Sequence, residues 1–324
     1  MKPVIWYEFT IDEANRQRLE AAAHVVCGGV VTANQDVFAV VVSAVLDAGP
    51  AFMDAVGPSL RAIVRPGIGT DNVDIPAATE RGILVINTPD APSESTAEHT
   101  VALLLATAKR VITGSRYLET GGFERSQLLG MELRDRVLGV VGFGRIGRRV
   151  AEICGLGLKM RILVYDPFIS DIDAPGIEFT KDLNDLLARA DAVTLHLPLT
   201  PETHHLIGEG QLRRMRPGAY LINAASGPIV DEAALIRALA DGHLAGAGVD
   251  VFDPEPPEGD NPLLQMRNVV CTPHIASYTD RGQAAMRQGV VDQLLQLLTG
   301  ERPPNIVNPT VWPGRAQRAP AKSQ

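Results

Sequence analysis

Three glycines in one short segment have the spacing of a phosphate-binding turn. The segment is Gly142-Phe143-Gly144-Arg145-Ile146-Gly147, which follows the apolar run 137–141 and opens a helix-like stretch. Between a strand and a helix, the first glycine permits a tight turn, the second lets the backbone approach a pyrophosphate, and the third lets the helix pack close to the strand. The helix start adds free N–H groups and the positive end of its dipole. The segment therefore predicts a bound dinucleotide with its pyrophosphate at this turn.

An acidic residue at the end of the next strand-like run supplies the second half of this pattern. Asp166 lies nineteen residues past Gly147, directly after the run 161–165. A carboxylate there accepts hydrogen bonds from the adenosine ribose hydroxyls and repels a 2′-phosphate. The next two residues, Pro167 and Phe168, supply no cation for such a phosphate. The sequence thus favours NAD over NADP as the cofactor.

Short β-branched runs alternate with helix-like segments over most of the chain, which predicts doubly wound parallel sheets of the α/β class. Gly121 and Gly122 interrupt the helical periodicity that follows the long helix expected at 95–111. The tail after Pro309 is expected to be poorly ordered. The expected strands are 4–7, 37–43, 61–64, 83–87, 137–141, 161–165, 192–195, 220–223, 245–250 and 268–271. The expected helices are 12–23, 76–81, 95–111, 145–155, 182–189, 231–241 and 280–298.

The bulk composition is ordinary for a soluble globular enzyme. A length of 324 residues suggests two domains, and 45% hydrophobic with 21% charged residues is ordinary. The net charge of −8 argues against nucleic acid, because phosphate binding needs a basic face. The longest apolar stretches are far short of the ~20 residues that span a bilayer, so no membrane partner is expected.

The cysteines and the N-terminus point to the cytoplasm. Cys27, Cys154 and Cys271 are widely spaced and form no CxxC pair, so neither a metal site nor a disulfide framework is expected. We expect them to be buried free thiols in a reducing compartment. The first residues lack the charged and apolar regions of a signal peptide.

Further segments resemble one protein family, in order and over nearly the whole chain. With the glycine segment, they make the chain similar to the D-isomer-specific 2-hydroxyacid dehydrogenases, which include phosphoglycerate, glycerate, D-lactate and formate dehydrogenases. The matching segments are GIGTDNVD at 67–74, AEH at 97–99, HLPLTPET at 196–203, GAYLINAASGPIVD at 218–231, GVDVFDPEP at 248–256, TPHIAS at 272–277 and NIVNP at 305–309.

The resemblance implies an architecture and an oligomeric state. A Rossmann domain for NAD is expected at 99–278, and a second, flavodoxin-like α/β substrate domain at 1–98 and 279–324. The active site of such proteins lies in the cleft, which closes over substrate by a hinge motion. The family is usually dimeric through its cofactor domains, so a homodimer is expected.

The resemblance also implies roles for single residues in hydride transfer between NADH and a carbonyl or hydroxy substrate. His274 falls on the position of the proton donor, and a histidine suits this role because its unperturbed pKa is about 6.5. Glu255 falls on the carboxylate that orients this imidazole and favours its charged form. Asp250 is expected at the nicotinamide carboxamide, and Arg145 and Ile146 are expected at the pyrophosphate, at the start of their helix. Further expected contacts are Ala224, Ala225 and Ser277 to the cofactor, and Ile68 and Gly69 to the substrate.

The chain departs from the family at one catalytic position. Ser226 stands where the family has an arginine that clamps the substrate carboxylate and polarises the carbonyl. Loss of one member of a buried charge pair costs about 2–5 kcal/mol, roughly 10²–10³ or more in rate. Arg65, just before the 67–69 loop, is the candidate replacement cation.

Three interpretations remain open from the sequence. The protein is a dehydrogenase in which another group binds the anion, or a dehydrogenase whose substrate needs no clamp, or a catalytically weak NAD(H)-binding sensor or partner-binding protein. Retention of His274 and Glu255 favours the first two. No arginine occurs around 42–44, where family members that take phosphorylated substrates carry one, so 3-phosphoglycerate is not expected as substrate.

Overall fold

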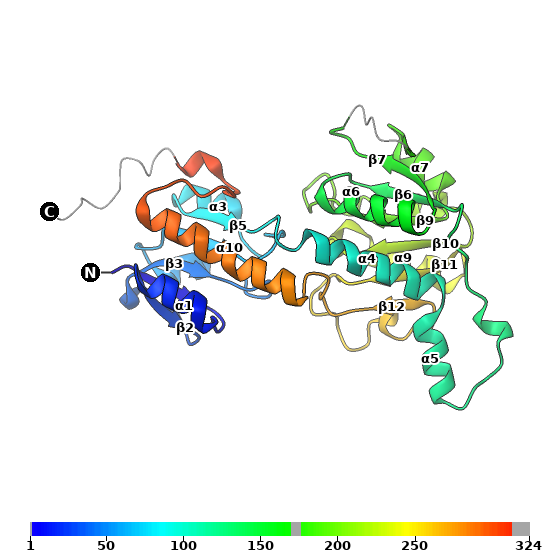
Figure 1. Cartoon of the computed structure of the whole chain (residues 1–324), viewed down its shortest axis with the longest axis horizontal. Coiled ribbons are helices and arrows are strands. Elements are labelled where there is room, and N and C mark those ends of the chain that lie inside the picture. Colours follow the sequence, from blue (N-terminus) through cyan, green and yellow to red (C-terminus); the bar gives the residue numbers. More distant parts are fainter. Residues whose placement is uncertain (1, 170–175, 313–324) are drawn as a thin grey trace. The chain divides into compact units, whose positions relative to one another are not determined.

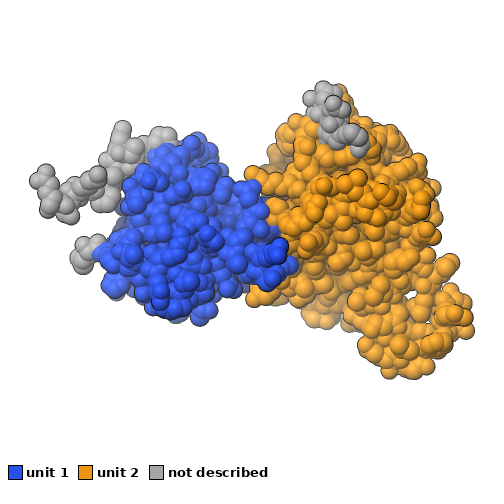
Figure 2. Space-filling view, in the orientation of Figure 1, with its two compact units in different colours: residues 1–92, 279–324 blue, residues 93–278 orange. Residues whose placement is uncertain are grey.

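The computed structural model describes residues 2–169 and 176–312, which fall into two compact units. Unit 1 comprises Met1–Pro92 and Thr279–Gln324, and unit 2 comprises Ser93–Tyr278 (Figure 2). The chain passes into unit 2 six residues before the expected position, because helix α4 begins at Ser93 and lies wholly in unit 2. Most of the tail expected to be poorly ordered, residues 313–324, lies outside the described residues, but Pro309–Val311 forms a 3₁₀ turn.

Unit 1 is built on a five-stranded parallel sheet. Its order is β2-β1-β3-β4-β5, which is the flavodoxin-like arrangement and confirms the predicted fold class of this domain. Strand β2 lies at an edge and was not predicted. The strands are β1 (Val4–Tyr7), β2 (His24–Cys27), β3 (Val37–Val41), β4 (Ala62–Arg65) and β5 (Leu84–Asn87).

Helices cover both faces of this sheet (Figure 1). Helices α1 (Glu13–Glu20) and α10 (Asp280–Thr299) pack on one face, where Leu19 and Leu294 join the core. Helices α2 (Pro50–Val56) and α3 (Ile75–Glu80) pack on the other. Because both faces are buried, β1 and β3 are apolar throughout, and β4 and β5 are apolar up to their last residues, Arg65 and Asn87. Unit 1 therefore completes its core with α10, which follows unit 2 in the chain.

Unit 2 is built on a seven-stranded parallel sheet of order β12-β11-β10-β9-β6-β7-β8. From the β8 edge this is the Rossmann order 3-2-1-4-5-6 with one strand added, which confirms the predicted fold class. The winding direction reverses between β6 and β9, and ligands of such sheets bind at the carboxyl ends of the strands at this reversal. The strands are β6 (Val137–Val141), β7 (Arg161–Tyr165), β8 (Ile177–Phe179), β9 (Ala192–Leu195), β10 (Ala219–Asn223), β11 (Leu244–Val249) and β12 (Val269–Cys271).

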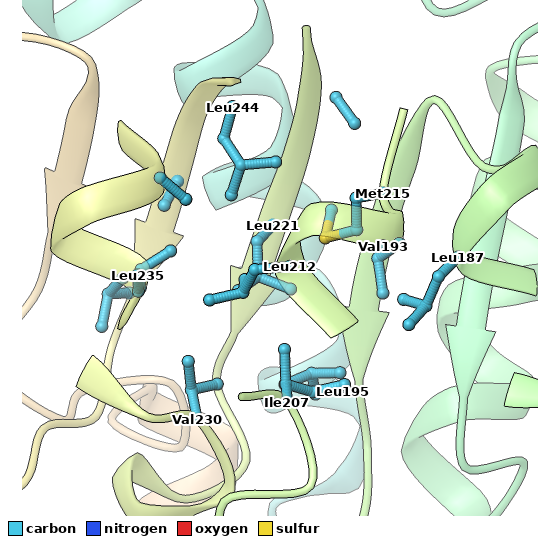
Figure 3. Packing of buried hydrophobic residues seen from close by; sticks show 14 of the residues in the cluster. Leu187, Val193, Leu195, Ile207, Leu212, Met215, Leu221, Val230, Leu235 and Leu244 are labelled. Atoms are coloured by element: carbon cyan, nitrogen blue, oxygen red, sulfur yellow. The ribbon is translucent and has the colours of Figure 1, made fainter. Parts of the chain in front are cut away.

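Two helical layers enclose the sheet of unit 2. Helices α4 (Ser93–Ala108) and α6 (Arg145–Glu152) bury one face, with Val101, Leu104 and Val150 in the core. On the other face, Figure 3 shows Leu212 and Leu235 from two helices packed towards Leu221 of β10. The helices on that face are α7 (Leu183–Arg189), α8 (Glu209–Arg214) and α9 (Glu232–Ala240).

The single helix expected at 95–111 is wrong: two helices occupy this region. Helix α4 ends at Ala108, and α5 (Val111–Glu119) begins after Arg110, whose φ of +54° is left-handed and cannot continue an α-helix. The Arg110 Nε–H donates to the carbonyl of Leu129 at 3.0 Å, which holds this turn. No residue of α5 is buried, so this helix stands away from the sheet (Figure 1).

The three cysteines are free thiols, as predicted, but only Cys154 is buried. Cys27 ends the edge strand β2 and Cys271 ends the edge strand β12, so each keeps partial access to solvent. Within residues 2–169 and 176–312, no helix is both long and apolar enough to cross a lipid bilayer.

Candidate active site

The glycine segment forms the turn between β6 and α6. Gly142 has a φ of +91°, and a Cβ there would lie 2.5 Å from the carbonyl oxygen of His196. A Cβ on Gly147 would lie 2.1 Å from the carbonyl oxygen of Gly142, so only glycine lets the helix approach this closely. A Cβ on Gly144 would meet no atom within 4 Å. Open space thus lies beside the N-terminus of α6, where the predicted pyrophosphate would bind.

Asp166 follows β7 and faces this turn. Its Oδ2 accepts the backbone N–H of Phe143 at 2.8 Å, and its Oδ1 accepts the N–H of Phe168 at 2.9 Å. These two hydrogen bonds fix the carboxylate beside the glycine turn. The turn and the acidic group of the predicted fingerprint are therefore adjacent in the structure.

His274 and Glu255 form a hydrogen-bonded pair. The Nδ1 of His274 lies 2.8 Å from Oε2 of Glu255, and the other carboxylate oxygen accepts the N–H of Phe252 at 2.9 Å. Both side chains are partly exposed, His274 by 45% and Glu255 by 32%. Because Nδ1 is engaged with the carboxylate, Nε2 is the ring atom suited to exchange a proton with a substrate.

The turn that carries His274 is organised by Asp250, which follows β11 and has no exposed surface. Its Oδ1 accepts the N–H of Ile275 at 2.9 Å and the hydroxyl of Thr272 at 2.5 Å, and its Oδ2 accepts the N–H of Ala276 at 2.8 Å. Burial alone would raise the pKa of Asp250, but the hydrogen bonds from His99, Thr272 and the two amides outweigh it and hold the pKa below its usual value. Asp250 is therefore ionised. The contact to a carboxamide remains a prediction.

The segment with Ser226 is held rigidly after β10. The Asn223 side chain donates to the carbonyl of Ser226 at 2.9 Å and accepts the N–H of Ala225 at 3.1 Å. A Cβ on Gly227 would lie 1.9 Å from the carbonyl oxygen of Phe252. The segment therefore packs against the loop that carries Glu255. Ser226 is 7% exposed and brings a hydroxyl to the position where the family arginine is expected.

The expected substrate residues lie in unit 1, at the end of β4. Arg65 donates from Nη1 to the carbonyl of Pro66, and its buried Nε finds no hydrogen-bond acceptor among the described residues. Burial lowers the pKa of the Arg65 guanidinium, and the charges of Asp71 and Glu8 oppose this effect. A buried, unsatisfied donor is costly. Arg65 is thus suited to receive an anion.

The next residues offer further donors. Ile68 and Gly69 are exposed, and their N–H groups donate no hydrogen bond within the described part of the chain. The side-chain amide of Asn87 donates a hydrogen bond to the carbonyl of Ile68 at 2.8 Å. Gly67 has a φ of +124°, which turns the chain at this point. Two adjacent amides are therefore presented by a fixed loop.

Two contacts at the site were not predicted from the sequence. The Nε2 of His99, on α4, lies 3.0 Å from Oγ1 of Thr272 and 3.4 Å from Oδ1 of Asp250. His99 and Thr272 are 173 positions apart. The sequence carries no periodicity that would link them.

Together these features define a dinucleotide-binding α/β protein. They are a doubly wound sheet, a glycine turn with an acidic residue after the next strand, and a histidine–carboxylate pair at the carboxyl edge of the sheet. Residues 101–276 match the family model described as D-isomer specific 2-hydroxyacid dehydrogenase, NAD binding domain. The chain belongs to the D-isomer specific 2-hydroxyacid dehydrogenase family, which confirms the resemblance predicted from its segments and the nicotinamide cofactor.

Three relatives illustrate the range of the family. A D-3-phosphoglycerate dehydrogenase of Archaeoglobus fulgidus is 44% identical over 258 residues, which are 79% of this chain but 49% of that protein. A glyoxylate reductase of Korarchaeum cryptofilum is 44% identical over 260 residues, 78% of each chain. The solved D-lactate dehydrogenase from Aquifex aeolicus, complexed with NAD and lactic acid, has a TM-score of 0.83 and 31% identity, and the match covers 94% of this chain and 99% of that one. The chain spans about half the length of the first of these relatives.

Proposed function

We propose that the protein is an NAD(H)-dependent oxidoreductase that interconverts a 2-hydroxy acid, or a related alcohol, and its keto form. The observation that carries this proposal is the His274–Glu255 pair, with 2.8 Å between Nδ1 and Oε2, in the unit that holds the glycine turn. A pure binding protein needs no such pair. The family membership of the chain supports the same reaction class.

In the reductive direction, a bound reduced nicotinamide would supply the hydride that the carbonyl carbon takes up. As the new C–H bond forms, the π electrons of the carbonyl would move to its oxygen, which would take a proton from Nε2 of His274. Glu255 would compensate the positive charge that the His274 imidazolium carries before it gives up this proton. The glycine turn and the amides of Arg145 and Ile146 would bind the pyrophosphate. Ala224, Ala225, Asp250 and Ser277 would line the nicotinamide.

The choice of NAD over NADP depends on Asp166. Its carboxylate is held beside the glycine turn by the amides of Phe143 and Phe168, so it cannot turn away from a 2′-phosphate without losing two hydrogen bonds. A fixed negative charge at this place favours the ribose diol and repels the phosphate.

The substrate is proposed to bind through unit 1. Arg65 and the amides of Ile68 and Gly69 would hold a carboxylate in place of the missing arginine at 226. The negative charge of Glu8 would repel a phosphate group on the substrate. Its Oε2 accepts the N–H of Ser43 at 2.6 Å, in the segment 42–44 where family members that take phosphorylated substrates carry an arginine. The proposed substrates are therefore 2-keto acids without phosphate.

NADH oxidation at its absorbance band tests the function. We expect turnover of glyoxylate, hydroxypyruvate, pyruvate or a larger 2-keto acid, and no turnover of 3-phosphoglycerate in the oxidative direction. We also expect kcat/KM to be at least about tenfold higher with NADH than with NADPH. Asp166→Asn, which keeps an acceptor oxygen but removes the charge, should reduce this preference. Absence of turnover with NADH bound would contradict the proposed function and support a binding protein.

We also propose a homodimer, formed through the arm of unit 2 from Val111 to Leu129. Four large apolar side chains of this arm are between 55% and 84% exposed: Val111, Leu118, Phe123 and Leu129. Exposed apolar side chains that lie together are typical of protein–protein interfaces. Light scattering after size exclusion should give twice the mass of 34.7 kDa, and Phe123→Ser with Leu129→Ser should give the monomer. A monomeric wild type at micromolar concentration would rule the dimer out.

The proposed location is the cytoplasm. Cys27, Cys154 and Cys271 are all free thiols, which persist in a reducing compartment. Fractionation of the source cells tests this, and recovery from a secreted fraction would contradict it.

A further inference from the structure

A chain of hydrogen bonds runs from helix α4 to the turn that carries His274. It comprises His99, Thr272 and Asp250, which we call the His99 relay. The Nε2 of His99 lies 3.0 Å from Oγ1 of Thr272, and this oxygen lies 2.5 Å from Oδ1 of Asp250. The three side chains come from α4, the end of β12 and the end of β11.

The direction of these hydrogen bonds follows from the donors available. An ionised Asp250 can only accept, so the single proton of the Thr272 hydroxyl is donated to Oδ1. The Thr272 oxygen can then only accept from His99. His99 must therefore carry a proton on Nε2. Its side chain is 19% exposed, so little water competes for this donor.

The relay ends on the backbone that presents the proton donor. Asp250 accepts the amides of Ile275 and Ala276, and its own carbonyl accepts the N–H of His274 at 2.8 Å. His274 has a φ of +51°, a conformation that a residue other than glycine adopts only where its surroundings impose it. The hydrogen bonds to Asp250 impose it here.

We propose that His99 is a positioning residue for hydride transfer: through Thr272 it fixes Asp250, and through Asp250 it fixes the left-handed turn that aims His274. His99 makes no contact with the reacting atoms in this proposal. The proposal depends on the proposed function for its kinetic effect, but its structural part can be tested without turnover.

The kinetic test compares variants of the full chain. His99→Leu and Thr272→Val should each lower kcat by about 10- to 100-fold, the loss expected for one hydrogen bond in a charged network, with the KM for NADH changed less than about twofold. The double variant should be no slower than the worse single variant, because both remove the same relay. His99→Gln keeps an N–H donor near the position of Nε2 and should recover most of the lost rate.

The control is His243→Leu. His243 is also a partly buried histidine of unit 2, with Nε2 3.0 Å from the carbonyl of Leu212, but it lies outside the relay. This variant should keep the wild-type kcat. If His99→Gln is as slow as His99→Leu, the residue fills space only and the positioning role is rejected.

A spectroscopic test distinguishes failure of the relay from failure of the proposed function. In NMR spectra of the histidine rings, His99→Leu should move or broaden the His274 signals, and His243→Leu should leave them unchanged. If wild type turns nothing over but this shift is seen, the relay stands and the proposed activity falls. If the His274 signals and the kcat both survive His99→Leu, the relay proposal is wrong.

Discussion

Replacing His274 by asparagine is expected to lower kcat by about 10²–10⁴, the usual contribution of a positioned acid–base group. Asparagine tolerates a left-handed backbone, so the φ of +51° and the amide contacts of the turn should persist. The cofactor should therefore still bind, because the glycine turn and Asp166 belong to other loops. Steady-state NADH oxidation and NADH fluorescence titration separate the two effects.

A matched control for this variant is His205→Asn. His205 is exposed and also has a left-handed backbone, with a φ of +50°, but it lies in the loop between β9 and α8. This variant should leave kcat unchanged. If His274→Asn kept more than about a tenth of the wild-type rate, a different group would have to supply the proton.

The second large effect is expected from Arg65→Met, which keeps the apolar stem and removes the guanidinium. If Arg65 binds the substrate carboxylate, kcat/KM for a 2-keto acid should fall about 10²–10³-fold, whereas an uncharged ketone or aldehyde should lose little. We expect this difference between charged and uncharged substrates because the buried Nε of Arg65 has no acceptor among the described residues and could donate to a substrate carboxylate. Initial rates across the carbonyl panel measure it.

The control for Arg65 is Arg81→Met, in the same unit. Arg81 is paired on the surface with Asp54 at 3.0 Å and should not affect either substrate class. Equal losses for charged and uncharged substrates would show that Arg65→Met damages the loop instead of an anion site. A gain in keto-acid reduction by Ser226→Arg, with no effect of Arg65→Met, would show that the wild type lacks an anion clamp.

Most of the sheet could be predicted from the sequence, because strands buried on both faces are continuous apolar runs. The edge strands β2 and β8 escaped this signal, since β2 buries only Val25 and β8 buries none of its three residues. The break between α4 and α5 also escaped it. The apolar periodicity continues through Val111, and the left-handed turn falls on Arg110 instead of a glycine.

Sequence spacing can locate the parts of the candidate site that are local along the chain, but not the contacts that depend on packing. The glycine turn and the step from Gly147 to Asp166 are fixed by a strand–turn–helix–strand unit, so spacing alone locates them. The His99 relay joins residues 173 positions apart, and only the folded sheet brings α4 against the end of β12. The contacts of Asp250 also depend on the fold, which brings His99, Thr272 and the amides of Ile275 and Ala276 to its carboxylate.

The return of the chain to unit 1 after Tyr278 has a consequence for biosynthesis. A nascent chain that has emerged up to Tyr278 contains every strand of both sheets, yet it lacks α10, which supplies Val290 and Leu294 to one face of the first sheet. The ribosome must add about another full helix before that face is covered. The unit begun first is thus completed last, and its apolar face is open to chaperones or to aggregation for the whole interval in which unit 2 is made.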